Sequence, residues 1–354
     1  MKWALRILML IGLGILAIAG YAIATARGST RPVGFQIAQI IDGQGRPMSV
    51  GLWYPTSASP RPTTLLGSTL IKVAPDGPVQ GQKLPVVVLS HGNGGSLASH
   101  VDLAMDLAGA GYIVAAPTHA GDSFADQSAA GSANLYSGRA QQIRATLDHV
   151  LEHWSGRNHI DADRVGAYGL SAGAFTVLTL IGGQPDMTLI ASHCVANPEF
   201  ICKVLQQAGS ELLDRNMDTD AFLTDHRIKA AVVAAPGLGF TFSNNGLAGV
   251  RVPVQLWVGG RDNLVPFATN GRIVRDGLGH RAEFHEARDA GHLSFLAPCG
   301  LLKPPAICAD VPGFDRAAFH STMNAQLIHF FDSQLLRRTF HSGSRTRSTK
   351  PSRA

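Results

Sequence analysis

Strand-like and helix-like stretches alternate along this chain from about residue 33 to residue 338. This alternation is typical of α/β proteins, in which helices cover both faces of a mostly parallel sheet. Leu84–Ser90 is apolar at almost every position, as a central strand buried on both faces must be. With an opening pair of strands at Val33–Ile41 and Met48–Tyr54, the pattern predicts one α/β domain over residues 32–338. Its sheet is expected to be eight-stranded and mostly parallel, with flanking helices.

The other predicted elements follow the same order along the chain. Before Leu84, the Pro-rich stretch Pro55–Lys83 is predicted to be a mobile loop. The remaining strands are predicted at Tyr112–Ala116, Arg164–Tyr168, Ile228–Ala235, Val254–Val258 and Ala282–His285. One helix is expected to begin near Ser96, and the others to cover Tyr136–Trp154, Ala172–Ile181, Phe267–Gly277 and Asp315–Leu336.

The net charge of +5, from 30 basic and 25 acidic residues, is unevenly distributed. The bases nearest the two ends are Lys2, Arg6, Arg27 and Arg31, and Arg337, Arg338, Arg345, Arg347, Lys350 and Arg353. The body between them therefore carries more acidic than basic residues, which argues against a nucleic-acid-binding face. Residues 339–354 are basic and rich in Ser and Thr, and are predicted to be a disordered tail.

An apolar run covers residues 7–26 and follows Lys2 and Arg6. Basic residues before an apolar run, and small residues toward its end, indicate a signal peptide or an N-terminal membrane anchor over residues 1–31. We therefore expect an exported protein, periplasmic or secreted. An uncleaved segment 7–26 would associate with the membrane and anchor the protein there.

The four cysteines agree with export, because disulfides form outside the reducing cytoplasm. Cys194 and Cys202 are close in sequence, as are Cys299 and Cys308, so we predict two local disulfides that each close a short loop. Four free thiols in the core are the alternative. A zinc site is disfavoured because no C-x-x-C spacing occurs.

The motif Gly169-Leu170-Ser171-Ala172-Gly173 lies where a predicted strand ends and a predicted helix begins. A serine at such a junction occupies a tight, strained turn that exposes its hydroxyl, and the flanking glycines let the turn pack against neighbouring backbone. We therefore predict that Ser171 is a catalytic nucleophile. A plain glycine-rich turn is the alternative.

A serine hydroxyl needs a base that is oriented by an acid, and both are expected after the nucleophile, at the carboxyl ends of later strands. Asp262 follows the strand Val254–Val258, and His292 follows the strand Ala282–His285. We predict that His292 is the base and Asp262 its acid. Asp289, three residues before His292, is the alternative acid.

The tetrahedral intermediate of such a reaction needs two backbone N–H donors, which form an oxyanion hole. Ala172, directly after the predicted nucleophile, supplies one. The other is assigned to Asn93 in the stretch Ser90–Gly95 (SHGNGG), which ends the first buried strand and continues into a glycine-rich loop. His91 in this stretch is predicted to hold the loop rather than to act as a base.

These motifs resemble those of the α/β-hydrolase superfamily, and the resemblance runs from about Val33 to Leu336. Within the superfamily, the chain resembles the exported bacterial proteins called predicted dienelactone hydrolases, which are similar to platelet-activating-factor acetylhydrolases. The stretch between Cys299 and Cys308 looks like that group too. The resemblance implies a serine hydrolase. Proper dienelactone hydrolases use a cysteine nucleophile where this chain has Ser171, so lactone cleavage is not implied.

Two further motifs are predicted to be non-catalytic. His149 and His153 match the H-x-x-E-H pattern of a zinc-protease helix, but helical spacing places them opposite its apolar face, so no metal is expected there. Residues 118–122 (THAGD), which include His119 and Asp122, follow a strand near the expected catalytic edge. We predict that this second motif shapes a loop.

Residues 184–227 interrupt the alternation after the nucleophile's helix, where this superfamily commonly carries a cap. Two interpretations stay open for the apolar residues of this cap insert. They either line an acyl pocket or pack a small satellite core around a Cys194–Cys202 bridge. The residues are Met187, Ile190, Phe200, Ile201 and Leu205.

Together the motifs predict an enzyme that hydrolyses carboxylic esters through an acyl-enzyme, with no metal or organic cofactor. A small-molecule or lipid ester is the expected substrate, and nucleic acid is not an expected partner. The sequence assigns neither an acyl length nor an oligomeric state. The alternatives are an acyltransferase or peptidase that uses the same three residues, and a catalytically silent binding protein of the cell envelope.

Overall fold

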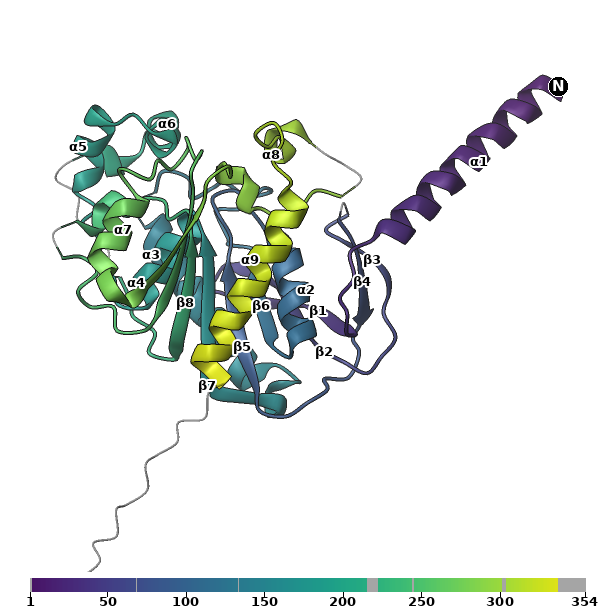
Figure 1. The fold of residues 1–354 in the computed structure, drawn as a ribbon, viewed down its shortest axis with the longest axis horizontal. Coiled ribbons are helices and arrows are strands. Elements are labelled where there is room, and N and C mark those ends of the chain that lie inside the picture. The colour runs from purple at the N-terminus through teal and green to yellow at the C-terminus, as the bar shows by residue number, and fades with distance from the viewer. Residues whose placement is uncertain are drawn as a thin grey trace, which may run out of the picture.

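A computed structural model describes residues 2–67, 69–132, 134–214, 222–243, 245–300 and 304–336. The predicted tail, residues 339–354, and part of the cap insert, residues 215–221, lie outside the described residues. One sheet runs through the body in the strand order β10-β9-β8-β7-β5-β6-β2-β1-β4-β3 (Figure 1). Its strands are β1 (Val33–Ile41), β2 (Pro47–Pro55), β3 (Arg61–Leu65), β4 (Thr69–Pro75), β5 (Leu84–Ser90), β6 (Ile113–Pro117), β7 (Ile160–Leu170), β8 (Ile228–Ala234), β9 (Val254–Gly259) and β10 (Ala282–Ala287).

The sheet has the predicted parallel core. Strands β5 to β10 pair in parallel, whereas β2 pairs antiparallel with both β1 and β6. Because parallel strands end at the same edge, the loops that follow β5, β7, β9 and β10 meet at one edge of the sheet. These loops carry the predicted functional residues.

In the described part of the chain, the sheet has two strands more than the predicted eight. β3 and β4 form an antiparallel hairpin inside the stretch that was expected to be a mobile loop, so that prediction is wrong. It relied on the prolines of the stretch. Pro62, however, lies in the outermost strand of the sheet, where a missing N–H is tolerated, and β4 buries Ile71 and Val73 completely.

Helices cover both faces of the sheet, and each face has its own apolar core (Figure 1). Leu107 of α2 and Leu327 of α9 are buried on one face, and Ile143 of α3 and Leu178 of α4 on the other. The helices are α1 (Lys2–Thr25), α2 (Val101–Ala110), α3 (Leu135–Asp148), α4 (Ala172–Leu180), α5 (Leu189–Ala196), α6 (Phe200–Gln207), α7 (Gly271–Leu278), α8 (Pro305–Cys308) and α9 (Arg316–Phe331). α3 and α9 each continue into a short π-helical turn, at His149–His153 and Asp332–Leu336.

The N-terminal helix α1 extends away from the body (Figure 1), and large apolar side chains along it, such as Trp3 and Leu16, are exposed. No helix in the described part of the chain is long and apolar enough to cross a membrane. The chain joins the body directly after α1. Ala26 is buried, and Nη2 of Arg27 lies 2.9 Å from a carboxylate oxygen of Asp106 in α2.

Both predicted disulfides, Cys194–Cys202 and Cys299–Cys308, are confirmed. The first joins α5 to α6 in the cap insert. Met187, Ile190 and Leu205 of the insert are buried within the same apolar core as α3 and α4, which favours packing over the lining of an open pocket. The described part of the insert therefore extends the main core, and its buried residues do not form a separate satellite core.

Candidate active site

Ser171 occupies a strained turn between β7 and α4. Its φ of 56° and ψ of −117° lie outside the regions that side-chain-bearing residues favour. A Cβ at Gly169 would collide with the backbone of Gly173, and a Cβ at Gly173 would collide with the carbonyl of Ser90. Glycine is therefore required at both positions, and the close approach brings the loop after β5 against Ser171.

Asp262 and His292 lie together at the ends of β9 and β10. Nδ1 of His292 donates a hydrogen bond to Oδ2 of Asp262 over 2.7 Å, and the two side chains are only 9% and 2% exposed. The other oxygen of Asp262 accepts the backbone N–H groups of Leu264 and Val265, over 3.0 and 2.8 Å. The carboxylate is thus fixed on both sides, and it orients the imidazole.

Ser171 is partly exposed beside the loops that hold this pair. All three residues belong to the described part of the chain, and within it no hydrogen bond joins the Ser171 hydroxyl to His292. Such bonds are often long in ligand-free enzymes and tighten when substrate binds. The structure therefore brings the predicted acid and base together, and the predicted nucleophile makes no hydrogen bond to them within the described residues.

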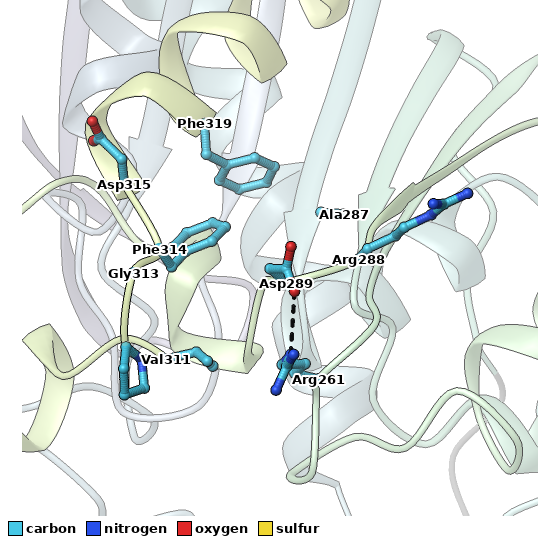
Figure 2. A pocket seen from close by; sticks show the side chains of 10 residues that line it. Arg261, Ala287, Arg288, Asp289, Val311, Gly313, Phe314, Asp315 and Phe319 are labelled. Carbon is cyan, nitrogen blue, oxygen red and sulfur yellow. Dashed lines mark hydrogen bonds and ion pairs between the residues drawn. The ribbon is translucent and has the colours of Figure 1, made fainter.

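The alternative acid, Asp289, forms an ion pair with Arg261 at 3.3 Å (Figure 2). Both members of this pair are largely exposed, at 69% and 58%. The pair borders a cavity of about 650 Å³, and Phe314 and Phe319 line the opposite side of this cavity. The cavity is lined by Arg261, Ala287, Arg288, Asp289, Val311, Pro312, Gly313, Phe314, Asp315 and Phe319, and so does not include the predicted catalytic residues.

The predicted oxyanion loop packs against the serine turn. A Cβ at Gly92 would lie 3.5 Å from Cβ of Ser171, so the chain at Asn93 passes close to the serine. The N–H of Ala172 is the first of α4, and N–H groups in the first turn of a helix have no partner within the helix. The two predicted donors thus belong to segments that flank the Ser171 hydroxyl.

Asp122 fixes the position of Asn93. One oxygen of its carboxylate accepts the side-chain amide of Asn93 over 2.7 Å and the backbone N–H of Gly94 over 2.9 Å. Nη1 of Arg139 pairs with the other oxygen at 2.5 Å. Asp122 therefore shapes a loop, as predicted, and that loop carries one of the predicted oxyanion donors.

Arg139 is the residue that the sequence analysis missed. It is buried, and it donates to the carbonyl of His91 and, over 3.3 Å, to the hydroxyl of Thr176 in α4. It therefore joins the predicted oxyanion loop to the helix that follows Ser171. A signal for it was present: Tyr136 and Ile143 lie three residues before and four after Arg139, so helical spacing places this lone cation on an apolar face.

His91 and His119 have structural roles in the same loop cluster. Nδ1 of His91 donates to the carbonyl of Gly92, and Nε2 accepts the backbone N–H of His119 over 3.0 Å. Burial and the nearby Arg139 charge lower the pKa of His91 to about 3. Burial and Arg139 also lower the pKa of His119, which contacts Ser90 and Gln142. Both rings are neutral, and their hydrogen bonds hold the loop in place.

The loop after β8 closes the other side of the serine turn. The N–H of Gly237 donates to the carbonyl of Ser171 over 3.2 Å. A Cβ at Gly237 would lie 3.5 Å from Oγ of Ser171 and 3.6 Å from the nitrogen of Ala172. The missing side chain keeps open the space beside both atoms, a feature that no sequence motif indicated.

The zinc-protease-like motif lies in the π-helical turn His149–His153 after α3. His153 is exposed and His149 is half-buried. Within the described residues, no group of three or more His, Cys, Asp or Glu side chains is placed to hold a metal ion.

The strand order and the serine turn define an α/β-hydrolase fold. A family model described as platelet-activating factor acetylhydrolase, isoform II, matches residues 61–153. A solved structure of a ferulic acid esterase from Streptomyces cinnamoneus is similar, with a TM-score of 0.63 and 20% identity over 88% of this chain and 92% of that chain. No curated protein sequence matches the chain. The family match includes Asn93, Asp122 and Arg139, and it ends before Ser171.

Proposed function

We propose that this protein hydrolyses carboxylic esters through an acyl-enzyme. The observation that carries the proposal is the combination of a strained serine turn at Ser171 with an Asp262–His292 pair on later loops at the same sheet edge. Nε2 of His292 faces away from Asp262 and takes the proton of the serine hydroxyl as Oγ attacks the ester carbonyl. The same nitrogen then gives the proton to the departing alcohol.

The second half of the reaction uses the same groups. A water molecule loses a proton to His292 and attacks the acyl-enzyme, and the carboxylic acid leaves as Ser171 regains its proton. Asp262 stays ionised and holds the imidazole in the tautomer that has Nε2 free to accept.

The developing oxyanion is stabilised by the N–H groups of Asn93 and Ala172. Fixed donors of this kind act without reorganisation at the moment of reaction, and one donor is typically worth about 10²- to 10³-fold in kcat. The hydrogen bonds of Asp122 with Asn93 and Gly94 hold the Asn93 donor in place. The first turn of α4 holds the Ala172 donor in place.

The comparisons support the reaction class. Both the matching family model and the similar solved structure carry names of ester-cleaving enzymes, an acetylhydrolase and a ferulic acid esterase. We further propose that the substrate is a small-molecule or lipid ester, and that the protein acts outside the cytoplasm. The two disulfides support export, because they persist in oxidising compartments.

The test uses the full chain, a fluorophosphonate probe and p-nitrophenyl esters of increasing acyl length. The probe should label Ser171 of the wild type, and Ser171→Ala should lose labelling and about 10⁴-fold or more of kcat. Ser192→Ala, which removes an exposed hydroxyl in the cap insert, is the matched control and should retain both. A Ser171→Ala protein that still labels at the wild-type rate would overturn the proposal.

A further inference from the structure

A second aspartate–histidine pair lies behind the loop that carries His292. Nδ1 of His320 in α9 is 2.6 Å from Oδ2 of Asp102 in α2, and the two side chains are 2% and 1% exposed. On its other side, Nε2 of His320 lies 2.9 Å from the carbonyl oxygen of Ser294. Ser294 belongs to the short 3₁₀ turn His292–Phe295, which we call the base turn.

The partners of His320 determine its protonation state. A carboxylate oxygen and a backbone carbonyl oxygen both accept hydrogen bonds and cannot donate them. Both ring nitrogens of His320 must therefore carry a proton, so the ring is an imidazolium. Burial raises the pKa of the Asp102 carboxyl, but the positive charge and hydrogen bond of His320 outweigh burial and hold this pKa well below its usual range.

Neighbouring groups complete this buried cluster. The side-chain amide of Asn324 donates to Asp102 over 2.9 Å and to Asp106 over 2.8 Å. Asp106 in turn pairs with Arg27. Oδ2 of Asp102 thus accepts hydrogen bonds from two α9 side chains, His320 and Asn324, and holds the imidazolium ring in one orientation, while Oδ1 is buried without a hydrogen-bond partner in the described part of the chain.

The side chain of Ser294 also makes hydrogen bonds that hold this residue in place. Its hydroxyl donates to Asp310 over 2.7 Å and accepts the backbone N–H of Gly291 over 3.1 Å. Arg316 fixes the Asp310 carboxylate with two hydrogen bonds, of 2.9 and 3.0 Å. The base turn is therefore held at its hydroxyl by Asp310 and at its carbonyl by His320.

We propose that His320 is a positioning residue for the reaction. As an imidazolium held by Asp102, it fixes the carbonyl of Ser294, two residues after His292, and so fixes the direction from which the His292 ring approaches Ser171. The inference rests on the proposed function. Catalytic groups have to be held within about 0.5 Å of the productive geometry, and a displacement of about 1 Å can cost 10²-fold in rate.

The test compares two double variants that both remove the buried ion pair. In Asp102→Asn with His320→Gln, the introduced glutamine amide can still donate to the Ser294 carbonyl. In Asp102→Asn with His320→Leu, that donor is lost while the volume is similar. Neither variant leaves a buried charge without its partner, which is the usual cause of misfolding in such changes.

The measurements are kcat and KM on p-nitrophenyl butyrate, with unfolding followed in urea. We expect the glutamine variant to keep kcat within about threefold of the wild type and the leucine variant to lose about 10- to 100-fold, with KM nearly unchanged in both. His329→Gln, an exposed histidine on the same helix, is the control and should match the wild type.

Two results would overturn the inference. One is equal kcat in the two double variants, and the other is an effect on KM or stability alone. Neither result touches the proposed function, which is tested separately by the loss of labelling and turnover in Ser171→Ala.

Discussion

The carboxylate of Asp122 and the guanidinium of Arg139 form an ion pair in which each side chain is 1% exposed. Taking both charges out of water is costly, and the pair repays that cost only when its remaining hydrogen-bonding groups are also satisfied. Asn93 and Gly94 satisfy Asp122, and His91 and Thr176 satisfy Arg139. The pair therefore connects the loop that carries Asn93, the proposed oxyanion donor, to the helix after Ser171.

The variant Asp122→Asn tests whether the Asp122–Arg139 ion pair holds this loop in place. The neutral side chain leaves the Arg139 charge buried without its counter-ion and no longer accepts at both oxygens. We expect a loss of about 3 to 5 kcal/mol in the free energy of unfolding, measured in urea. At temperatures where the variant is folded, kcat should fall about 10-fold or more, because the N–H of Asn93 loses its fixed position.

Asp126→Asn is the control for this change, since Asp126 is an exposed carboxylate in the same loop. It should leave kcat unchanged. A folded Asp122→Asn protein with wild-type kcat would show that Asp122 stabilises the fold without positioning Asn93.

Asp262→Asn and Asp289→Asn separate the two candidate acids. The first leaves His292 in the wrong tautomer and should lower kcat by about 10⁴-fold on p-nitrophenyl esters. The second breaks an exposed pair with Arg261, which is worth about 0 to 1 kcal/mol of stability, and should leave kcat near the wild-type value. The opposite ranking, with both proteins folded, would make Asp289 the acid.

The Cys299–Cys308 disulfide lies beside the base turn, because Asp310, two residues further on, holds the hydroxyl of Ser294. A bridge across so short a loop contributes about 2 to 3 kcal/mol in the chain-entropy model. Cys299→Ser with Cys308→Ser should therefore lower kcat at temperatures where the protein stays folded. Activity and circular dichroism measured on the same samples check this.

The other disulfide provides the comparison for that experiment. Cys194→Ser with Cys202→Ser loosens the cap insert and should change KM or acyl-length preference while kcat on the shortest ester is retained. Equal effects of the two pairs of substitutions on kcat would contradict a specific link between Cys299–Cys308 and His292.

Acid should destabilise the protein between about pH 6.5 and pH 4, because two buried histidines are neutral in the folded state. Burial lowers the pKa of His100 to about 4, and burial with the Arg139 charge lowers that of His91 to about 3. The usual histidine pKa is about 6.5, so between pH 6.5 and 4 the unfolded chain binds protons that the folded protein does not. The free energy of unfolding should therefore fall as pH decreases through this window, by up to about 1.4 kcal/mol per pH unit for each of the two.

Urea unfolding at several pH values measures this slope. His100→Gln should make it shallower by about one proton. A wild-type slope near zero from pH 6.5 to 4.5 would contradict the neutral, buried state of these rings.

Local pattern was sufficient for the parallel core of the sheet and for the strained turn at Ser171, because apolar runs and a glycine-flanked serine are each readable within a few residues. The pairing of Asp262 with His292 followed from their order after successive strands. The β3–β4 hairpin was missed because an edge strand tolerates proline, so local propensity was overridden by position in the sheet.

The long-range polar pairs could not be predicted from the sequence. Asp122 and Arg139 lie on a loop and a helix 17 positions apart, and Asp102 and His320 lie 218 positions apart. No periodicity relates such residues, since their contact depends on how α2, α3 and α9 pack on the finished sheet. For the same reason, the open space at Gly237 became evident only from the geometry around Ser171.

The attachment of Arg27 to Asp106 sets a practical limit on shortening the chain. A protein that starts at Arg27 loses the exposed apolar helix and keeps the contact with α2, as well as the bridge between Arg27 and Ile71 in β4. A protein that starts at Arg31 or Val33 loses both. The better starting point for expression is therefore Arg27, and later starting points should lower solubility or melting temperature.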